Sequence, residues 1–262
     1  MTGAVVLPLL LLFIYFANSF FFGALLSVVA FLAMGEFCAM ALPLERVLEG
    51  RIASIAAALF LPVLASQKFL PSLGSMVLLL ILFSCLFLWR LRGDIRVTAP
   101  QLGLIFFGFC YVPLLLSHFA MLHSLEFGRQ WVYLLLLIIM CGDSAAYFVG
   151  ISLGRRKLYP AVSPNKSIEG AIGGLAGSVL GAFIAQLTFF PQLAWWDVLL
   201  LGTILGALGQ VGDLFESLLK RSFGVKDSGT LIPGHGGILD RLDSLLFAFP
   251  PAFYYALMRF SG

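Results

Sequence analysis

Five carboxylates stand in or beside long apolar stretches in the second half of the chain, where a charged group is costly. Asp143 belongs to CGDSAAYFVG, Asp213 and Glu216 belong to GQVGDLFESLLKRS, and Asp240 and Asp243 belong to LDRLDS. A charged side chain at membrane depth costs about 2.5 to 3.5 kcal/mol on insertion scales, so each acid needs a partner or a function. Hard oxygen ligands beside basic residues are typical of a divalent cation that carries phosphates.

The spacing of these acids predicts that they face one region. On a helix, Asp213, Glu216 and Lys220 fall at i, i+3 and i+7 on one face, with Ser217 beside them. The two aspartates of LDRLDS stand three residues apart, again on one face. An alternative stays open, in which the acids form only a structural salt-bridge cluster with the basic residues Lys220, Arg221, Lys226 and Arg241.

Two polar loops carry groups that suit phosphate. The segment SPNKSIEG, residues 163–170, offers Ser163, Lys166 and Ser167 directly ahead of a new helix. A helix N-terminus with hydroxyls and a lysine is a ready anion site. The same residues also fit ordinary helix capping, in which Ser167 binds the backbone near Gly170, and this alternative stays open.

The second loop is part of KDSGTLIPGHGGILDRLDS, residues 226–244. Its glycines, which include Gly236 and Gly237, permit backbone conformations closed to other residues and let amide groups approach a ligand. A bare glycine turn would not need Lys226, Asp227 and His235 as well. We expect the loop to bind an anion, and the contact that His235 makes is left open.

The elements that must position these residues are membrane helices. Of the 262 residues, 61% are hydrophobic and 11% are charged, which is far outside the range of soluble domains. We expect an all-α polytopic membrane protein with about nine transmembrane helices, at about 4–22, 24–43, 52–70, 73–91, 101–120, 130–151, 170–190, 195–219 and 243–260. The first two spans are separated only by a turn near Gly23, so eight is the alternative count. The first span is expected to be retained rather than cleaved as a signal peptide.

The distribution of basic residues predicts the orientation. Thirteen of the sixteen lysines and arginines fall in the loops after spans two, four, six and eight. By the positive-inside rule these loops face the cytoplasm, which places the acids near the cytoplasmic ends of the C-terminal spans. No basic patch with interleaved aromatic residues exists, so we expect no nucleic-acid partner.

The two halves of the chain are expected to differ in role. Residues 1–128 form an N-terminal scaffold of about five spans, in which Glu36 is a buried-looking acid that could be scaffold alone. Residues 129–262 form a C-terminal catalytic region of about four spans. Glycines four residues apart in this region predict close helix packing and make a homodimer plausible.

The segment SLLKRSFGVKDSGTLIPGHGGILDRLD, Ser217–Asp243, resembles the signature of the phosphatidate cytidylyltransferases, also called CDP-diacylglycerol synthases. The segments DSAAYFVG at 143–150 and SPNKSIEG at 163–170 are similar to two further conserved stretches of that family. The second departs from the usual pattern at Asn165 and Ser167 and keeps Lys166 and Glu169 in place. The resemblance covers roughly residues 140 to 245.

The resemblance implies a magnesium-dependent transfer in a bacterial cytoplasmic membrane, in which CTP and phosphatidate from the inner leaflet give CDP-diacylglycerol and pyrophosphate. A potassium ion could accompany the magnesium. The metal ligands would be Asp143, Asp213, Glu216, Asp240 and Asp243. The catalytic residues would be Asp213, Asp240, Lys220 and Lys226. The residues that bind substrate would be Ser163, Lys166, Ser167, Ser217, Arg221, Asp227, His235, Gly236, Gly237 and Arg241.

Two rival functions remain open. A CTP-dependent kinase of lipid alcohols such as polyprenols would also be polytopic and bind cytidine nucleotides, although the unbroken signature argues against it. A cation-coupled transporter would also place carboxylates within spans. Transport sites tend toward the bilayer midplane, whereas these acids are expected near the cytoplasmic end.

Overall fold

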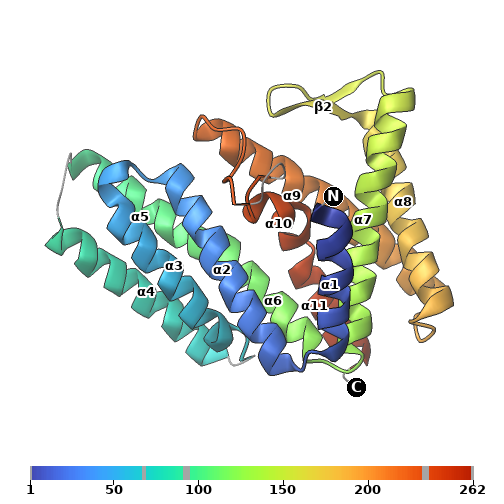
Figure 1. Cartoon of the computed structure of the whole chain (residues 1–262), viewed down its shortest axis with the longest axis horizontal. Helices are drawn as coiled ribbons and strands as arrows, with labels where there is room; N and C mark the ends of the chain where they lie inside the picture. Colours follow the sequence, from blue (N-terminus) through green and yellow to red (C-terminus); the bar gives the residue numbers. More distant parts are fainter. Residues whose placement is uncertain (1, 67–68, 91–94, 232–235, 261–262) are drawn as a thin grey trace. The chain divides into compact units, whose positions relative to one another are not determined.

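The computed structural model describes residues 2–66, 69–90, 95–231 and 236–260, and most of them are helical (Figure 1). The α-helices are α1 (Thr2–Phe16), α2 (Ser19–Ala41), α3 (Val47–Leu64), α4 (Phe69–Trp89), α5 (Ile95–Phe109), α6 (Leu115–His123), α7 (Gly128–Leu153), α8 (Ile168–Thr188), α9 (Trp195–Ser222), α10 (Leu239–Leu246) and α11 (Phe249–Phe260). A 3-10 turn, η1 (Leu44–Arg46), precedes α3, and a π-helical turn, η2 (Cys110–Leu114), joins α5 to α6.

Six helical segments among the described residues are long and apolar enough to cross a membrane. They are Ser19–Ala41, Leu44–Leu64, Ile95–His123, Gly128–Leu153, Ile168–Thr188 and Trp195–Ser222, with a shorter apolar helix at Gly74–Trp89. The expected class, an all-α polytopic membrane protein, is confirmed. The count of nine spans stays a prediction.

Two of the expected span boundaries were wrong. The first break lies at Ala17 and Asn18, and Gly23 is inside α2. Asn and Ser favour helix ends because their short polar side chains compete for nearby backbone groups, and Asn18 and Ser19 stand at this break. The expected last span is divided into α10 and α11. Pro250 and Pro251 lack the N–H groups that a continuous helix would need there, but they fit the first turn of α11.

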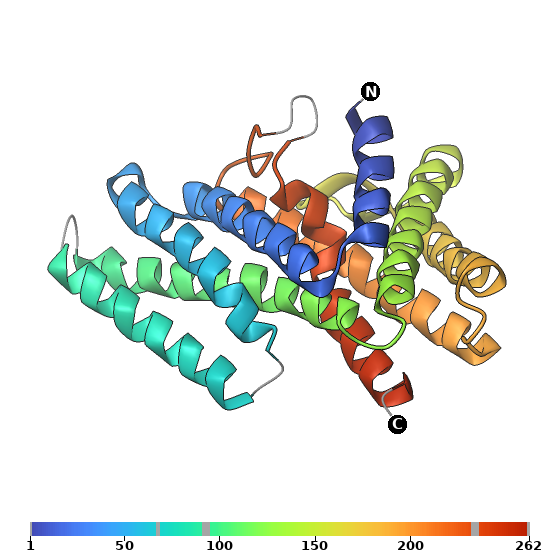
Figure 2. The ribbon, with the colours of Figure 1, turned by 60° about the horizontal axis from the view of Figure 1, so that its bottom comes forward.

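The chain forms two compact units, and the first comprises Met1–Ser19, Leu122–Arg221 and Asp243–Gly262. In this unit α7 and α8 run side by side (Figures 1 and 2). A Cβ atom added at Gly177 of α8 would lie 2.7 Å from the carbonyl oxygen of Cys141, and one at Gly202 of α9 would lie 2.6 Å from the Cα of Val179. The glycine spacing therefore serves close helix packing, as predicted.

A short hairpin leads from α7 to α8 and is the only sheet among the described residues. Strand β1 (Lys157–Tyr159) pairs antiparallel with β2 (Ser163–Ser167). The carboxylate of Glu169, in the first turn of α8, accepts hydrogen bonds from the backbone amides of Arg155 and Arg156 at 3.0 and 3.2 Å. These bonds tie the base of the hairpin to the start of α8.

The second unit comprises Phe20–Met121 and Ser222–Leu242. It contains α2 to α6, with α3 and α4 in contact (Figure 2), together with most of the signature segment, Ser217–Asp243. The two compact units are defined by contacts within the chain. The boundary predicted between residues 128 and 129 instead separates a scaffold from a catalytic region. That functional boundary stays a prediction.

Candidate active site

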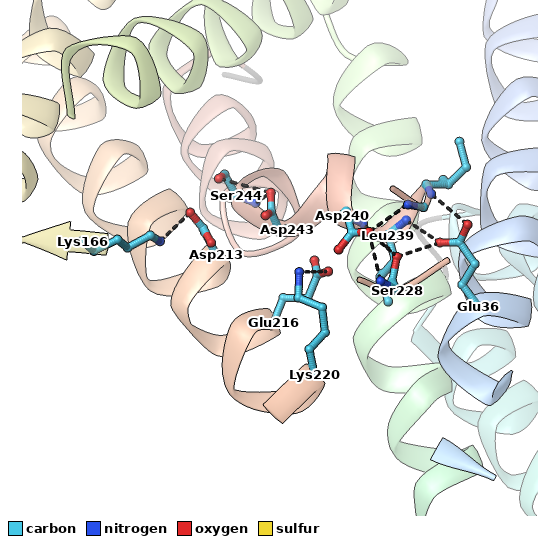
Figure 3. Close-up of polar contacts among 12 residues, drawn as sticks. Glu36, Lys166, Asp213, Glu216, Lys220, Ser228, Leu239, Asp240, Asp243 and Ser244 are labelled. Carbon is cyan, nitrogen blue, oxygen red and sulfur yellow. Dashed lines mark hydrogen bonds and ion pairs between the residues drawn. The ribbon is translucent and has the colours of Figure 1, made fainter. Parts of the chain in front are cut away.

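Three helices of the first unit bring together Asp143 of α7, Asp213 of α9 and Asp243 of α10. Asp143 interacts electrostatically with Asp213 and with Lys166. Asp243 interacts electrostatically with both other aspartates. Lys166, which reaches in from β2, forms an ion pair with Asp213 (Figure 3). We call Asp143, Asp213, Asp243 and Lys166 the carboxylate cluster.

A glycine on α9 explains why these aspartates meet. A Cβ atom added at Gly212 would lie 2.5 Å from the carbonyl oxygen of Asp243 and 3.4 Å from the Cβ of Phe247. Only a residue without a side chain lets α9 and α10 approach this closely. The neighbouring Gln210 donates from its side-chain amide to the carbonyl oxygen of Ala171 on α8, at 3.0 Å. Asp213 is therefore held between α8 and α10.

One turn further along α9, Glu216 and Lys220 form an ion pair at 3.2 Å (Figure 3). The Glu216 side chain is fully buried, and only 12% of the Lys220 side chain is exposed. Lys220 also interacts electrostatically with Asp243, which links this pair to the carboxylate cluster. The predicted face of Asp213, Glu216 and Lys220 is therefore present on α9.

Ser167 and Lys166 have different surroundings although they are adjacent. Ser167 is buried and caps α8, since its hydroxyl oxygen accepts a hydrogen bond from the Gly170 amide at 3.1 Å. The capping alternative left open by the sequence is thus observed for Ser167. Lys166 points instead toward Asp213, and Ser163 stands at the start of β2. The hairpin therefore presents a lysine, rather than a row of free hydroxyls, to the carboxylate cluster.

A second polar cluster lies in the second unit and involves an acid whose role the sequence left unassigned. Asp240 Oδ2 accepts hydrogen bonds from the amides of Ser228 and Gly237, at 3.0 and 2.8 Å. Glu36 of α2 accepts hydrogen bonds from the amides of Ile238 and Leu239, at 2.9 and 2.8 Å (Figure 3). Asp240 therefore organises the loop before α10, and its expected role as a metal ligand opposite Asp213 stays a prediction.

The remaining predicted residues differ in exposure. Four of them are exposed: Arg221, Lys226, Asp227 and Arg241. Ser217 is half-buried, and His235 lies outside the described residues. Gly236 has a φ of +79°, a backbone conformation that favours glycine, and a Cβ there would lie 2.5 Å from Asp240 Oδ2. Gly237 is buried and its amide is bound to Asp240.

The carboxylate cluster has the ligand chemistry of a hard divalent cation. Together with Glu216, four carboxylates interact with two described lysines, Lys166 and Lys220, and like charges in such a group repel unless cations lie among them. Among the residues that the structure describes, no three His, Cys, Asp or Glu side chains are arranged as a preformed metal site. The donors therefore fit such an ion in type and charge, and their coordination is not preformed.

Comparison with known proteins gives a consistent result. The chain matches the cytidylyltransferase family over residues 1–260. It is 42% identical over 165 residues to the phosphatidate cytidylyltransferase of Bacillus subtilis (strain 168), covering 63% of this chain and 61% of that protein.

Staphylococcal relatives show the same likeness over a shorter stretch. The phosphatidate cytidylyltransferase of Staphylococcus aureus (strain COL) is 48% identical over 124 residues, and that of Staphylococcus epidermidis (strain ATCC 12228 / FDA PCI 1200) is 46% identical over 123 residues. Each of these two alignments covers 47% of both chains. The alignments thus span about half to three fifths of the relatives' length, while the family match extends over nearly all of this sequence. On that match, the chain belongs to the cytidylyltransferase family.

Proposed function

We propose that this protein transfers a cytidylyl group from CTP to phosphatidate and so produces CDP-diacylglycerol and pyrophosphate. The observation that carries the proposal is the carboxylate cluster beside the lysine of β2, within a chain of the cytidylyltransferase family. Relatives named phosphatidate cytidylyltransferase support the choice of lipid substrate.

In the proposed reaction, an oxygen of the lipid phosphate attacks the α-phosphorus of CTP. A new phosphorus–oxygen bond forms, and the bond from the α-phosphorus to the bridging oxygen breaks, which releases pyrophosphate. The attacking phosphate oxygen is already ionised at neutral pH, so no strong general base is needed. What the site must supply is the alignment of two polyanions and compensation of the charge that develops on the leaving pyrophosphate.

The residues of the site divide this work. Lys166 and Lys220 each lie beside carboxylates, and we assign them to substrate phosphates that reach the cluster. The exposed basic residues Arg221, Lys226 and Arg241 would attract the triphosphate from water. Asp143, Asp213 and Asp243 would hold Mg²⁺, which when bound would neutralise charge on the phosphates of CTP. A second cation such as K⁺, and Glu216 and Asp240 as further ligands, belong to the same proposal.

The location follows from the substrates. Phosphatidate is a membrane lipid and CTP is soluble in water, so a polar site near the membrane surface is required. By the positive-inside rule we place this site at the cytoplasmic face of a bacterial inner membrane. A homodimer packed through small-residue helix faces is also proposed, on the glycine spacing alone.

The test uses the purified protein in mixed micelles with phosphatidate, CTP and Mg²⁺. We expect pyrophosphate release that requires both substrates, stops on addition of a chelator and returns with excess Mg²⁺. Diacylglycerol in place of phosphatidate is the control, because a lipid-alcohol kinase would use it and release CDP instead. Pyrophosphate release that does not depend on phosphatidate, or transfer to diacylglycerol, would contradict the proposal.

A further inference from the structure

Glu36 of α2 contacts the signature segment although about 200 residues separate them in sequence. Its Oε1 accepts the amide hydrogen of Ile238 at 2.9 Å, and its Oε2 accepts that of Leu239 at 2.8 Å (Figure 3). Oε2 also lies 3.1 Å from the hydroxyl of Ser228. One carboxylate therefore contacts two described parts of the signature segment, at residue 228 and at residues 238–239.

The carboxylate of Glu36 acts as the N-terminal cap of α10. The first amides of a helix have no acceptor within the helix, and a negative charge there is favoured by the helix dipole. α10 begins at Leu239, and the residue before it is Ile238, whose side chain has no acceptor. Glu36 supplies from another helix the cap that the local sequence lacks.

Ser228 couples this cap to Asp240. The Ser228 hydroxyl lies 2.9 Å from Asp240 Oδ2 as well as 3.1 Å from Glu36 Oε2, so its single hydrogen can be donated to either carboxylate. The amide of Asp240 donates back to the Ser228 oxygen at 3.3 Å. We call Glu36, Ser228 and Asp240 the capping cluster.

Two glycines of the signature segment are explained by this cluster. A Cβ atom added at Gly229 would lie 2.8 Å from Glu36 Oε1, and one added at Gly237 would collide with Glu36 and with Ser228. Both glycines therefore leave room for the Glu36 carboxylate, in addition to any approach of a substrate. The close fit means that Glu36 and the loop backbone specify each other's position.

From these contacts we infer that Glu36 is a positioning residue for the transferase reaction, which holds Ser228, Gly229 and residues 236–240 at the start of α10 in their working conformation. The inference rests on the proposed function, and it gives the N-terminal half of the chain a part in catalysis. Asp240, Arg241 and Asp243 all follow within α10, so a loss of this cap would misalign them. Misplacement by about 1 Å can cost on the order of 100-fold in rate.

The test compares Glu36→Gln with Glu45→Gln, a control at an exposed glutamate nine residues further along the chain. In Glu36→Gln one carboxylate oxygen becomes an NH₂ group, which faces N–H and O–H donors and leaves the amide of either Ile238 or Leu239 without this acceptor. We expect kcat to fall on the order of 100-fold, with KM for CTP within about threefold. In hydrogen exchange, the amides of residues 228–231 and 236–240 should exchange faster, and those of the other described residues should be unchanged.

The exchange measurement needs no substrate, so it separates this inference from the proposed function. If the wild type fails to transfer cytidylyl groups but Glu36→Gln still speeds exchange at residues 228–231 and 236–240, the function is wrong and the positioning contact stands. A Glu36→Gln variant with normal kcat, or one whose exchange rises evenly along the chain, overturns the inference. If Glu36→Gln does not fold, Ser228→Ala is measured in its place. We expect faster exchange in the same described residues and a loss of roughly tenfold in kcat. A Ser228→Ala variant that is unchanged in both measurements overturns it.

Discussion

A buried ion network in the second unit allows a stability prediction whose size follows from the geometry. Glu49 of α3 pairs with Arg46 at 3.0 Å and with Arg90 at 3.3 Å, and Arg46 also donates to Gln101 of α5 at 3.1 Å. The side chains of Glu49, Arg46 and Arg90 are 0%, 2% and 14% exposed. The guanidinium of Arg46 lies 4.3 Å from the centre of the Phe87 ring. The network thus joins the start of α3 and the residue after α4 to the middle of α5.

Glu49→Gln removes the carboxylate that Arg46 and Arg90 share among the described residues. Breaking a buried ion pair by removing one partner costs about 3–5 kcal/mol, because the remaining buried charge loses that partner. At roughly 2–4 °C per kcal/mol for a chain of this size, Tm should fall by about 6–20 °C. The assay is thermal unfolding of the detergent-solubilised protein, followed by tryptophan fluorescence.

Two comparisons make the result decisive. Glu45→Gln removes an exposed carboxylate next to Arg46 in the sequence, and it should change Tm by no more than about 2 °C. The triple variant Arg46→Met, Glu49→Leu, Arg90→Met replaces the network by apolar groups and should recover most of the loss. A Glu49→Gln protein with the Tm of the wild type would mean that this ion network does not stabilise the fold.

The remaining predictions concern the carboxylate cluster. Asp213→Asn removes the charge that pairs with Lys166, and we expect kcat for CDP-lipid formation to fall about 10²–10³-fold, whereas near-normal turnover at saturating Mg²⁺ would contradict the assignment. Gly212→Ala adds a Cβ atom 2.5 Å from the Asp243 carbonyl oxygen, so it should cost about 1–3 kcal/mol in stability and also lower activity. Gly103→Ala is its control, because a Cβ there meets nothing within 4 Å and should leave both quantities unchanged or slightly improve stability. If Gly212→Ala and Gly103→Ala changed stability and activity equally, close packing of α9 against α10 would not depend on Gly212.

Much of the fold could be predicted from the sequence because hydrocarbon thickness fixes the length of an apolar helix. The spans expected at 130–151, 170–190 and 195–219 correspond to α7, α8 and α9. Hydropathy could not predict a helix break that is formed by apolar residues. The division between α10 and α11 depends on the missing N–H groups of Pro250 and Pro251, and these residues are apolar.

The candidate site was predictable where one helix carries several of its residues. Helical spacing alone placed Asp213, Glu216 and Lys220 on one face, and the cost of charge in a membrane singled out Asp143. The partner of Glu36 could not be predicted, because it lies about 200 residues away and consists of backbone amides that have no signal in the sequence. The cost of a charged side chain at membrane depth also applies to Glu36, and it indicated that this acid needs a partner.

Transfer of a cytidylyl group to a lipid phosphate can be followed through the fate of two labels. The purified protein is given phosphatidate, Mg²⁺ and CTP labelled either at the α-phosphorus or at the γ-phosphorus. We expect the α-label to enter the lipid fraction as CDP-diacylglycerol and the γ-label to leave as pyrophosphate. Entry of the γ-label into lipid, or release of both labels without a labelled lipid, would contradict it.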